Sequence, residues 1–115
     1  MSSPIWKPNE TQIQNANITK FLSYTNQKTG SKLLNYWDLH QYSIDYSDKF
    51  WQLVADYCGA IGDFSGPVRE GESMIDAKWF PEASLNFSET MLARRDKADA
   101  IVFRGENKVE LRLSF

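Results

Sequence analysis

The clearest helix signal in this 115-residue sequence is the stretch Ser47-Asp48-Lys49-Phe50-Trp51-Gln52-Leu53-Val54-Ala55-Asp56-Tyr57-Cys58-Gly59. Ser47 is expected to cap the helix, Asp48 suits its positively charged first turn, and Gly59 is placed to end it. Several apolar residues recur at helical spacing and are expected to share one face: Phe50, Trp51, Val54, Tyr57 and Cys58. The stretch therefore predicts an amphipathic helix.

Two more helices are predicted upstream of this stretch. Apolar residues at helical spacing predict one helix over residues 10–26, with Gly30 as its stop, and another over residues 35–43. Residues 61–77, which follow the central helix, carry several glycines among charged residues. They predict a long connector with one short strand near Val68.

A fourth helix is predicted to open at Asn86. Asn86 and Glu89 have the spacing of a capping box, in which each side chain bonds the backbone of the other. The helix is expected to run to Arg94 or Arg95, whose charges suit its negative end.

The last segment changes from helical to β-type patterning. Residues 100–103 form a β-type run, residues 109–113 alternate apolar and polar side chains, and 104–108 resemble a turn. The fold class predicted is mainly α with a short β-hairpin. A strand that stops close to Phe115 is unusual at the end of a natural domain. We therefore expect residues 1–98 to be a helical N-terminal segment and 99–115 the first hairpin of a larger α/β domain.

Composition excludes several classes of partner. The 13 basic and 15 acidic residues give a net charge of −2 without a basic stripe, so neither nucleic acid nor a membrane is expected as a partner. Cys58 is the only cysteine, which rules out an internal disulfide and favours a reducing, cytoplasmic location. The sequence has neither a signal-peptide core nor an apolar run long enough to span a bilayer.

Residues able to support chemistry are few and scattered. The loop Gly62-Asp63-Phe64-Ser65-Gly66-Pro67 is a poor phosphate cradle, because Pro67 lacks a donor and Asp63 repels phosphate. His40 and Cys58 could ligate a metal or form a nucleophile pair only with further groups, and Cys58 is expected to be a small packed hydrophobe.

Paired carboxylates and aromatic side chains do not define a site either. The pairs Glu70 with Glu72 and Glu82 with Glu89 lie outside apolar runs that would raise their pKa. The prediction is therefore that the chain has no catalytic, cofactor-binding or metal-ligating residue. Trp37 and Trp51 are expected in the core or an interface. Trp79 and Phe80, in a connector too short to bury both, are expected to dock against further protein rather than a ligand.

A family resemblance rests on motifs that occur in order along nearly the whole chain. The longest resembles a stretch near the start of acetoacetyl-CoA synthetases: Trp79-Phe80-Pro81-Glu82-Ala83-Ser84-Leu85-Asn86-Phe87-Ser88-Glu89. Shorter matches are Ile5-Trp6-Lys7-Pro8 with the segment 13–21, Tyr42-Ser43-Ile44 with Phe50-Trp51, Ala100-Ile101-Val102-Phe103-Arg104, and Leu113-Ser114-Phe115. Glu82 stands where the family commonly has Gly, and Tyr42 where it commonly has Trp. Both departures concern the subfamily rather than the chemistry.

The resemblance implies a two-step ligase. The parent enzyme would activate acetoacetate with ATP and Mg²⁺ to an acyl-adenylate, and CoA would then displace AMP. Acetate and propionate are the alternative acid substrates. The family's phosphate loop, substrate pockets and catalytic lysine lie beyond Phe115, so this part alone is expected to bind no cofactor and to be inactive. Its expected partners are the remainder of its own chain or a second copy of itself. The alternative is a free-standing helical module that binds another protein.

Overall fold

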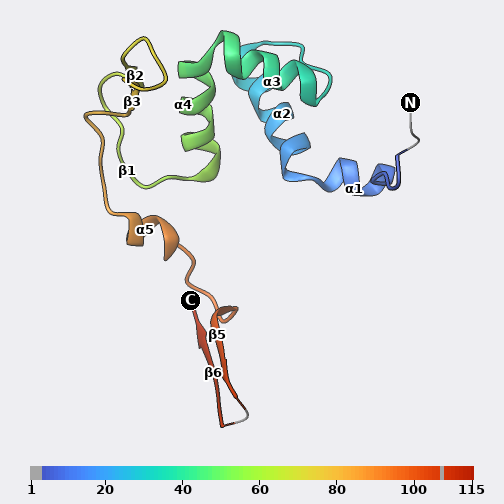
Figure 1. The fold of residues 1–115 in the computed structure, drawn as a ribbon, viewed down its shortest axis with the longest axis vertical. Coiled ribbons are helices and arrows are strands. Elements are labelled where there is room, and N and C mark those ends of the chain that lie inside the picture. Colours follow the sequence, from blue (N-terminus) through green and yellow to red (C-terminus); the bar gives the residue numbers. More distant parts are fainter. Residues whose placement is uncertain (1–3, 107) are drawn as a thin grey trace.

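Four helices gather at one end of the molecule and a two-stranded ribbon extends from the other, as Figure 1 shows. The computed structural model describes residues 4–106 and 108–115, so the first three residues of the predicted helical segment and Asn107 of the predicted turn lie outside it. The elements, in order, are α1 (Glu10–Asn15), α2 (Asn17–Thr29), α3 (Tyr36–Asp45), α4 (Ser47–Cys58), β1 (Gly62–Asp63), β2 (Arg69–Glu70), β3 (Lys78–Trp79), β4 (Ser84–Leu85), α5 (Phe87–Met91), β5 (Asp99–Gly105) and β6 (Val109–Ser114).

The helix predicted over residues 10–26 is two helices. Ala16 is extended, with ψ of 140°, and separates α1 from α2. Asn9 and Gln12 form a capping box at the start of α1, with bonds of 2.9 and 2.8 Å. The Thr19 hydroxyl donates to the Ile13 carbonyl across the break, at 2.6 Å. The same carbonyl accepts from the Ala16 N–H at 3.2 Å, so two hydrogen bonds stabilise the turn between α1 and α2. Gly30 ends α2 with a φ of 71°, as predicted.

Helices α3 and α4 meet at a sharp corner. The Asn35 side chain caps α3 by accepting from the backbone N–H groups of Trp37 and Asp38, at 2.8 and 3.1 Å. Tyr46 lies between the two helices, and its side chain makes no capping bond. The prediction that Ser47 caps α4 is therefore wrong, because α3 runs on past residue 43 and leaves only Tyr46 for the corner. Gly59 ends α4 with a φ of 67°, as predicted.

The core lies where α2, α3 and α4 converge. It consists of four buried apolar side chains: Phe21, Leu39, Tyr42 and Leu53. Thr25 is fully buried beside them, and its hydroxyl donates to the Phe21 carbonyl at 3.0 Å. The predicted apolar face of α4 is confirmed in part, since Phe50 and Val54 pack against this core. It omitted Leu53, the buried residue of the helix, and it wrongly included Cys58, which is exposed. Helix α4 packs against α2 and α3 through the side centred on Leu53.

The connector after α4 contains two small strand pairs. Strand β1 pairs with β4 and β2 pairs with β3, both antiparallel. The predicted short strand near Val68 is β2. Asn86 caps α5 by accepting from the N–H of Ser88 at 3.1 Å, but no capping box forms with Glu89. Helix α5 ends at Met91, several residues before the predicted end.

The hairpin predicted at the end of the chain is present. Strands β5 and β6 are antiparallel, and Ile101, Val102 and Phe103 lie opposite Leu113, Arg112 and Leu111. Figure 1 shows this ribbon leading away from the helices. A ribbon of two strands has no further strand at either edge, so its stability depends on what covers its faces.

Replacing Leu53 by Ala should destabilise the helical end by about 2–4 kcal/mol, because it leaves a cavity in the small core. The loss is measured as the shift in urea midpoint followed by helical circular dichroism. Ile44→Ala is the matched control, since Ile44 is 59% exposed, and it should cost less than about 0.5 kcal/mol. Equal losses for the two variants would contradict the position of this core.

Candidate docking surface

A series of aromatic contacts links the helical core to the connector. Phe21 in the core lies edge-on to Phe50, with ring centroids 5.7 Å apart. Phe50 contacts Trp51 at 5.5 Å, and Trp51 contacts Trp79 of β3 at 5.7 Å. Contacts of this geometry contribute about 0.5–1.5 kcal/mol each beyond the area they bury. The series therefore holds the β2–β3 pair against α4.

An ion pair fastens the same junction. The Arg69 Nε atom lies 3.3 Å from the Asp48 carboxylate in the first turn of α4. The Arg69 guanidinium also lies 5.7 Å from the centre of the Trp79 ring, which is its cross-strand neighbour. We call Asp48, Arg69, Trp79 and Trp51 the clamp. The sequence did not reveal it, because Asp48 and Arg69 are far apart in the chain and neither has an unusual local pattern.

Phe80 has a strained backbone, with a φ of 47°. Its N–H donates to the Val68 carbonyl at 2.7 Å, and its carbonyl accepts from Ala83 at 2.9 Å. Its ring packs edge-on to Phe64 at 5.3 Å. The prediction that Trp79 and Phe80 depend on further protein for contacts is wrong in part. Phe80 has a partner in the connector, and Trp79, 41% exposed, has one in α4.

One face of the ribbon is apolar and uncovered in the described structure. The register places its large apolar side chains together, each about half exposed: Ile101, Phe103, Val109, Leu111 and Leu113. The opposite face carries Val102 but is otherwise charged: Arg112 pairs with Asp99 and lies 3.8 Å from Glu110. Such a division between faces is typical of a sheet with one face packed against protein and the other in water.

A second apolar surface lies between α2 and α4. It is an open concavity of about 280 Å³, lined mainly by Ile18, Phe21, Phe50, Trp51, Val54 and Tyr57. Trp37 is 73% exposed, so it does not belong to the core, one of the two locations predicted for it. Together with the ribbon face, these surfaces suit docking against other protein better than binding a small molecule.

The residues considered for chemistry do not form a reactive group. His40 and Cys58 are both exposed, and His40 stacks on Tyr36 with ring centroids 6.1 Å apart. Within residues 4–106 and 108–115, no three His, Cys, Asp or Glu side chains are grouped as a metal site. The Ser65 N–H donates to Asp63 at 2.9 Å and lowers the pKa of that carboxyl. The loop at residues 62–67 is therefore an ordinary turn stabilised by Asp63.

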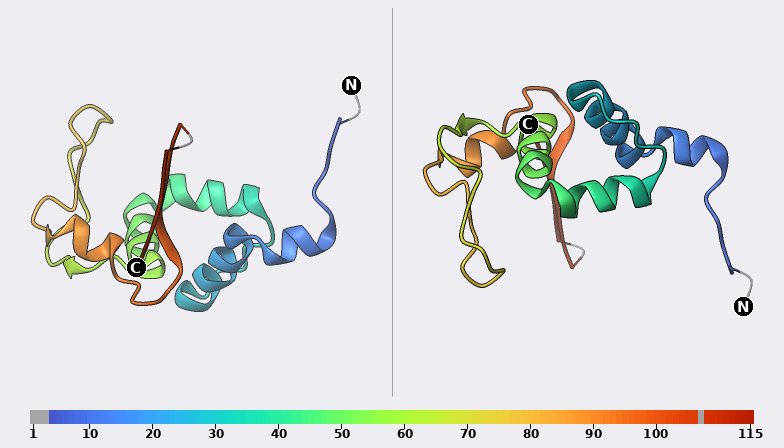
Figure 2. Two further views of the ribbon diagram at one scale, coloured as in Figure 1. Left: turned by 90° about the horizontal axis from the view of Figure 1, so that it is seen from below. Right: turned by 90° about the horizontal axis from the view of Figure 1, so that it is seen from above.

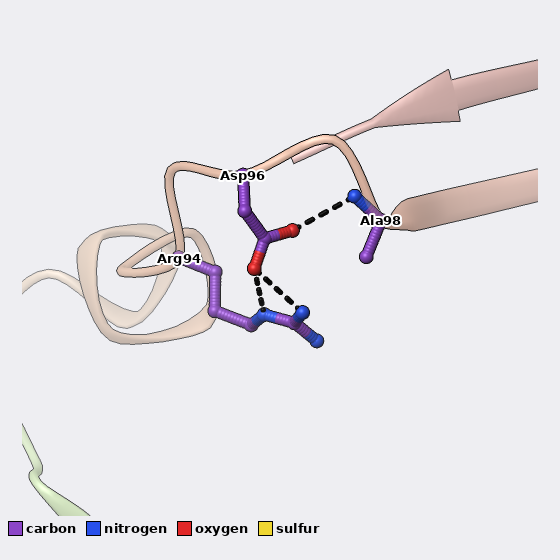
Figure 3. A network of polar contacts seen from close by, with 3 residues as sticks. All are labelled: Arg94, Asp96 and Ala98. Atoms are coloured by element: carbon purple, nitrogen blue, oxygen red, sulfur yellow. Dashed lines mark hydrogen bonds and ion pairs between the residues drawn. The ribbon is translucent and has the colours of Figure 1, made fainter.

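The turn between α5 and the ribbon is organised by Asp96, shown in Figure 3. Its carboxylate accepts from the Ala98 N–H at 2.8 Å and from the Arg94 guanidinium at 3.0 and 2.6 Å. These bonds, the one from Ala98 first, hold the pKa of Asp96 below its usual value. Arg94 also lies over the Phe115 ring at 4.8 Å, so one side chain joins the turn to the end of the ribbon.

Comparison with known proteins gives this surface a context. Residues 36–91 match the family described as acetyl-coenzyme A synthetase N-terminus. The acetoacetyl-coenzyme A synthetase of Rhizobium meliloti is 34% identical over 114 residues, which cover 97% of this chain and 17% of the relative. This chain is homologous to the N-terminal region of acetoacetyl-CoA synthetases. The predicted resemblance is thereby confirmed.

Further acetoacetyl-CoA synthetases agree in sequence and in fold. The one from Danio rerio is 27% identical and is matched over 95% of this chain and 16% of its own length. The solved acetoacetyl-CoA synthetase of Streptomyces lividans superposes with a TM-score of 0.85 at 28% identity, over 98% of this chain and 18% of that chain. The chain thus spans about a sixth of these relatives, and the predicted fold class agrees with the matched part. Within the described residues, no helix has the length and apolar character needed to cross a membrane.

Arg69→Met should loosen the clamp, because it removes the charge that contacts both Asp48 and the Trp79 ring. We expect the near-ultraviolet circular dichroism of the Trp51–Trp79 pair to fall substantially while the helical signal stays within about 10% of the original. Arg104→Met is the control and should change neither signal. An unchanged aromatic signal for Arg69→Met would contradict the clamp.

The Asp96 turn should loosen in acid. Because the pKa of Asp96 is lowered in the folded chain, its bonds favour folding above the ordinary carboxyl pKa of about 3.9 and are lost as pH falls through the folded value. Carbon-detected NMR should show Asp96 titrating below pH 3.9, with the Ala98 amide shift moving in parallel. In Asp96→Asn the Ala98 shift should stop moving over this range. Titration of Asp96 at an ordinary pH would contradict the assignment.

Proposed function

We propose that this chain serves as the N-terminal part of an ATP-dependent acid–thiol ligase that makes acetoacetyl-CoA. The observation that carries the proposal is the 34% identity to the Rhizobium meliloti acetoacetyl-coenzyme A synthetase over 97% of this chain. In the proposed reaction, acetoacetate attacks ATP to give an acyl-adenylate and pyrophosphate. The CoA thiol then attacks the acyl carbon and AMP leaves.

The role proposed for this region is structural docking rather than bond making. Its large exposed apolar surfaces, the ribbon face and the concavity between α2 and α4, are suited to contact with the remainder of a ligase chain. ATP, Mg²⁺ and CoA would be held by that remainder. The clamp supports this role, because it fixes the β2–β3 part of the connector to the helix that lines the concavity.

The acid and the compartment are part of the same proposal. Acetoacetate is favoured over acetate and propionate because several relatives carry that substrate in their names. AMP release with each of the three acids, measured on the ligase that carries this chain, tests the choice.

A cytoplasmic location is proposed from the single, exposed Cys58, since a reducing compartment keeps such a thiol free.

A chimera tests whether this region works as a ligase N-terminus. The chain replaces the matching part of the Rhizobium meliloti enzyme, and AMP release is measured with acetoacetate, ATP and CoA. We expect the chimera to keep activity within about tenfold of the parent, while deletion of the region abolishes it. The isolated chain should show no activity above the blank.

A second pair of variants compares charges on the ribbon face with a matched control on the opposite face. Phe103→Arg with Leu111→Arg should inactivate the chimera, because buried unpaired charges oppose docking. Arg104→Ser with Glu110→Ser, on the opposite face, should not. A folded chimera as inactive as the deletion would contradict the proposed function and favour a free-standing interaction module.

A further inference from the structure

The loop between β2 and β3 ends in two apolar side chains that no other described residue covers. Met74 and Ile75, which we call the tip, are each 93% exposed. Figure 2 shows this loop, in olive, reaching away from the helices in both views. Adjacent large apolar side chains that are fully exposed to water are typical of residues that insert into the surface of a binding partner.

The loop that carries the tip is held closed by a close backbone approach, a hydrogen bond and the pairing of β2 with β3. Gly71 has a φ of 90°, and a Cβ there would lie 2.5 Å from the Asp76 carbonyl oxygen, so the two sides of the loop meet closely. The Ser73 hydroxyl lies 2.6 Å from the Asp76 carboxylate. At its base the loop continues into the β2–β3 pair that Arg69 fastens to α4. A tip held in this way loses little conformational entropy when it binds.

Acidic side chains surround the tip and restrict what it can enter. Glu72 and Asp76 flank Met74 and Ile75, while at the base of the loop Glu70 lies opposite Lys78 in the β2–β3 pair. An anionic membrane surface would repel these carboxylates, as would nucleic acid. The favoured acceptor is an apolar or aromatic socket on a protein, with lysine or arginine at its rim.

This chain itself has such a socket. It is an open concavity of about 420 Å³ lined by Lys28, Thr29, Ser31, Tyr42, Tyr46 and Lys49. The Tyr42 and Tyr46 rings lie 5.0 Å apart. The Lys49 Nζ atom is 5.6 Å from the Tyr46 ring, and Lys28 is held 5.5 Å from the Tyr24 ring. The socket thus offers two lysines and the half-exposed Tyr46 ring, and its positive charge is complementary to an apolar tip flanked by carboxylates.

We propose that the tip of one copy of this chain inserts into the lysine–tyrosine socket of a second copy. The exposure of Met74 and Ile75 means that the tip does not occupy its own socket. Because tip and socket are different surfaces, the contact is head-to-tail, and each dimer keeps one free tip and one free socket. The association is weak, with a Kd on the order of 0.1 mM, and grows with concentration.

Two variants of the full 115-residue chain test this contact. Met74→Ser with Ile75→Ser removes the tip, and Lys28→Glu with Lys49→Glu reverses the rim of the socket. Analytical ultracentrifugation from 10 µM to 1 mM should show oligomers beyond a dimer for the unchanged chain, and at least about tenfold weaker association for each variant alone. A mixture of the two variants should form dimers only, because one supplies the intact tip and the other the intact socket.

Two further measurements keep the result specific. Ile101→Ser with Phe103→Ser, on the ribbon face, should leave the head-to-tail association unchanged, and sodium chloride at 0.5 M should weaken it several-fold relative to 0.05 M. Far-ultraviolet circular dichroism should be equal for all variants, since the altered side chains are exposed. The proposal is overturned if the unchanged chain is monomeric at 1 mM, if only the ribbon variant reduces association, or if the mixture forms no dimer.

Discussion

The contact between Trp51 and Trp79 is the point on which the arrangement of this molecule depends. Trp51 belongs to a helix whose other side reaches the core through Phe50, and Trp79 belongs to a strand that otherwise has one short partner. Two-residue strands are too short to hold their position alone. The ring contact, with the Arg69–Asp48 ion pair beside it, therefore transmits the rigidity of the helices to the connector.

The small core explains why so much apolar surface stays outside. Only four apolar side chains are buried among the described residues, while both the ribbon and the concavity between α2 and α4 present large apolar groups to water. A small fold buries a limited share of its surface, and this one buries less because its elements are spread out. The chain is homologous to one sixth of a larger enzyme, which is why we propose that these exposed faces pack against further protein.

Local patterns predicted local structure well and packing poorly. Gly30 and Gly59 were recognised as helix ends because a left-handed residue favours glycine, and Asn35, directly before its helix, caps it. The break at Ala16 was missed, since alanine is a good helix former and the bonds from Thr19 and Ala16 to the Ile13 carbonyl are evident only in the folded chain. The burial of Leu53 was not predicted, and Cys58 was wrongly expected to be packed, because spacing gives a helix its apolar side but does not locate the neighbouring helices.

The sequence by itself predicted the principal helices, the terminal hairpin and the family, because capping residues, strand alternation and the motif at 79–89 are all local in the chain. Only the tertiary structure decided that Arg69 meets Asp48 and that Trp79 meets Trp51. It also decided that the tip and the socket lie on separate surfaces of the same chain. These contacts join residues many positions apart. Their geometry follows from the way helices and connector pack, which no short pattern records.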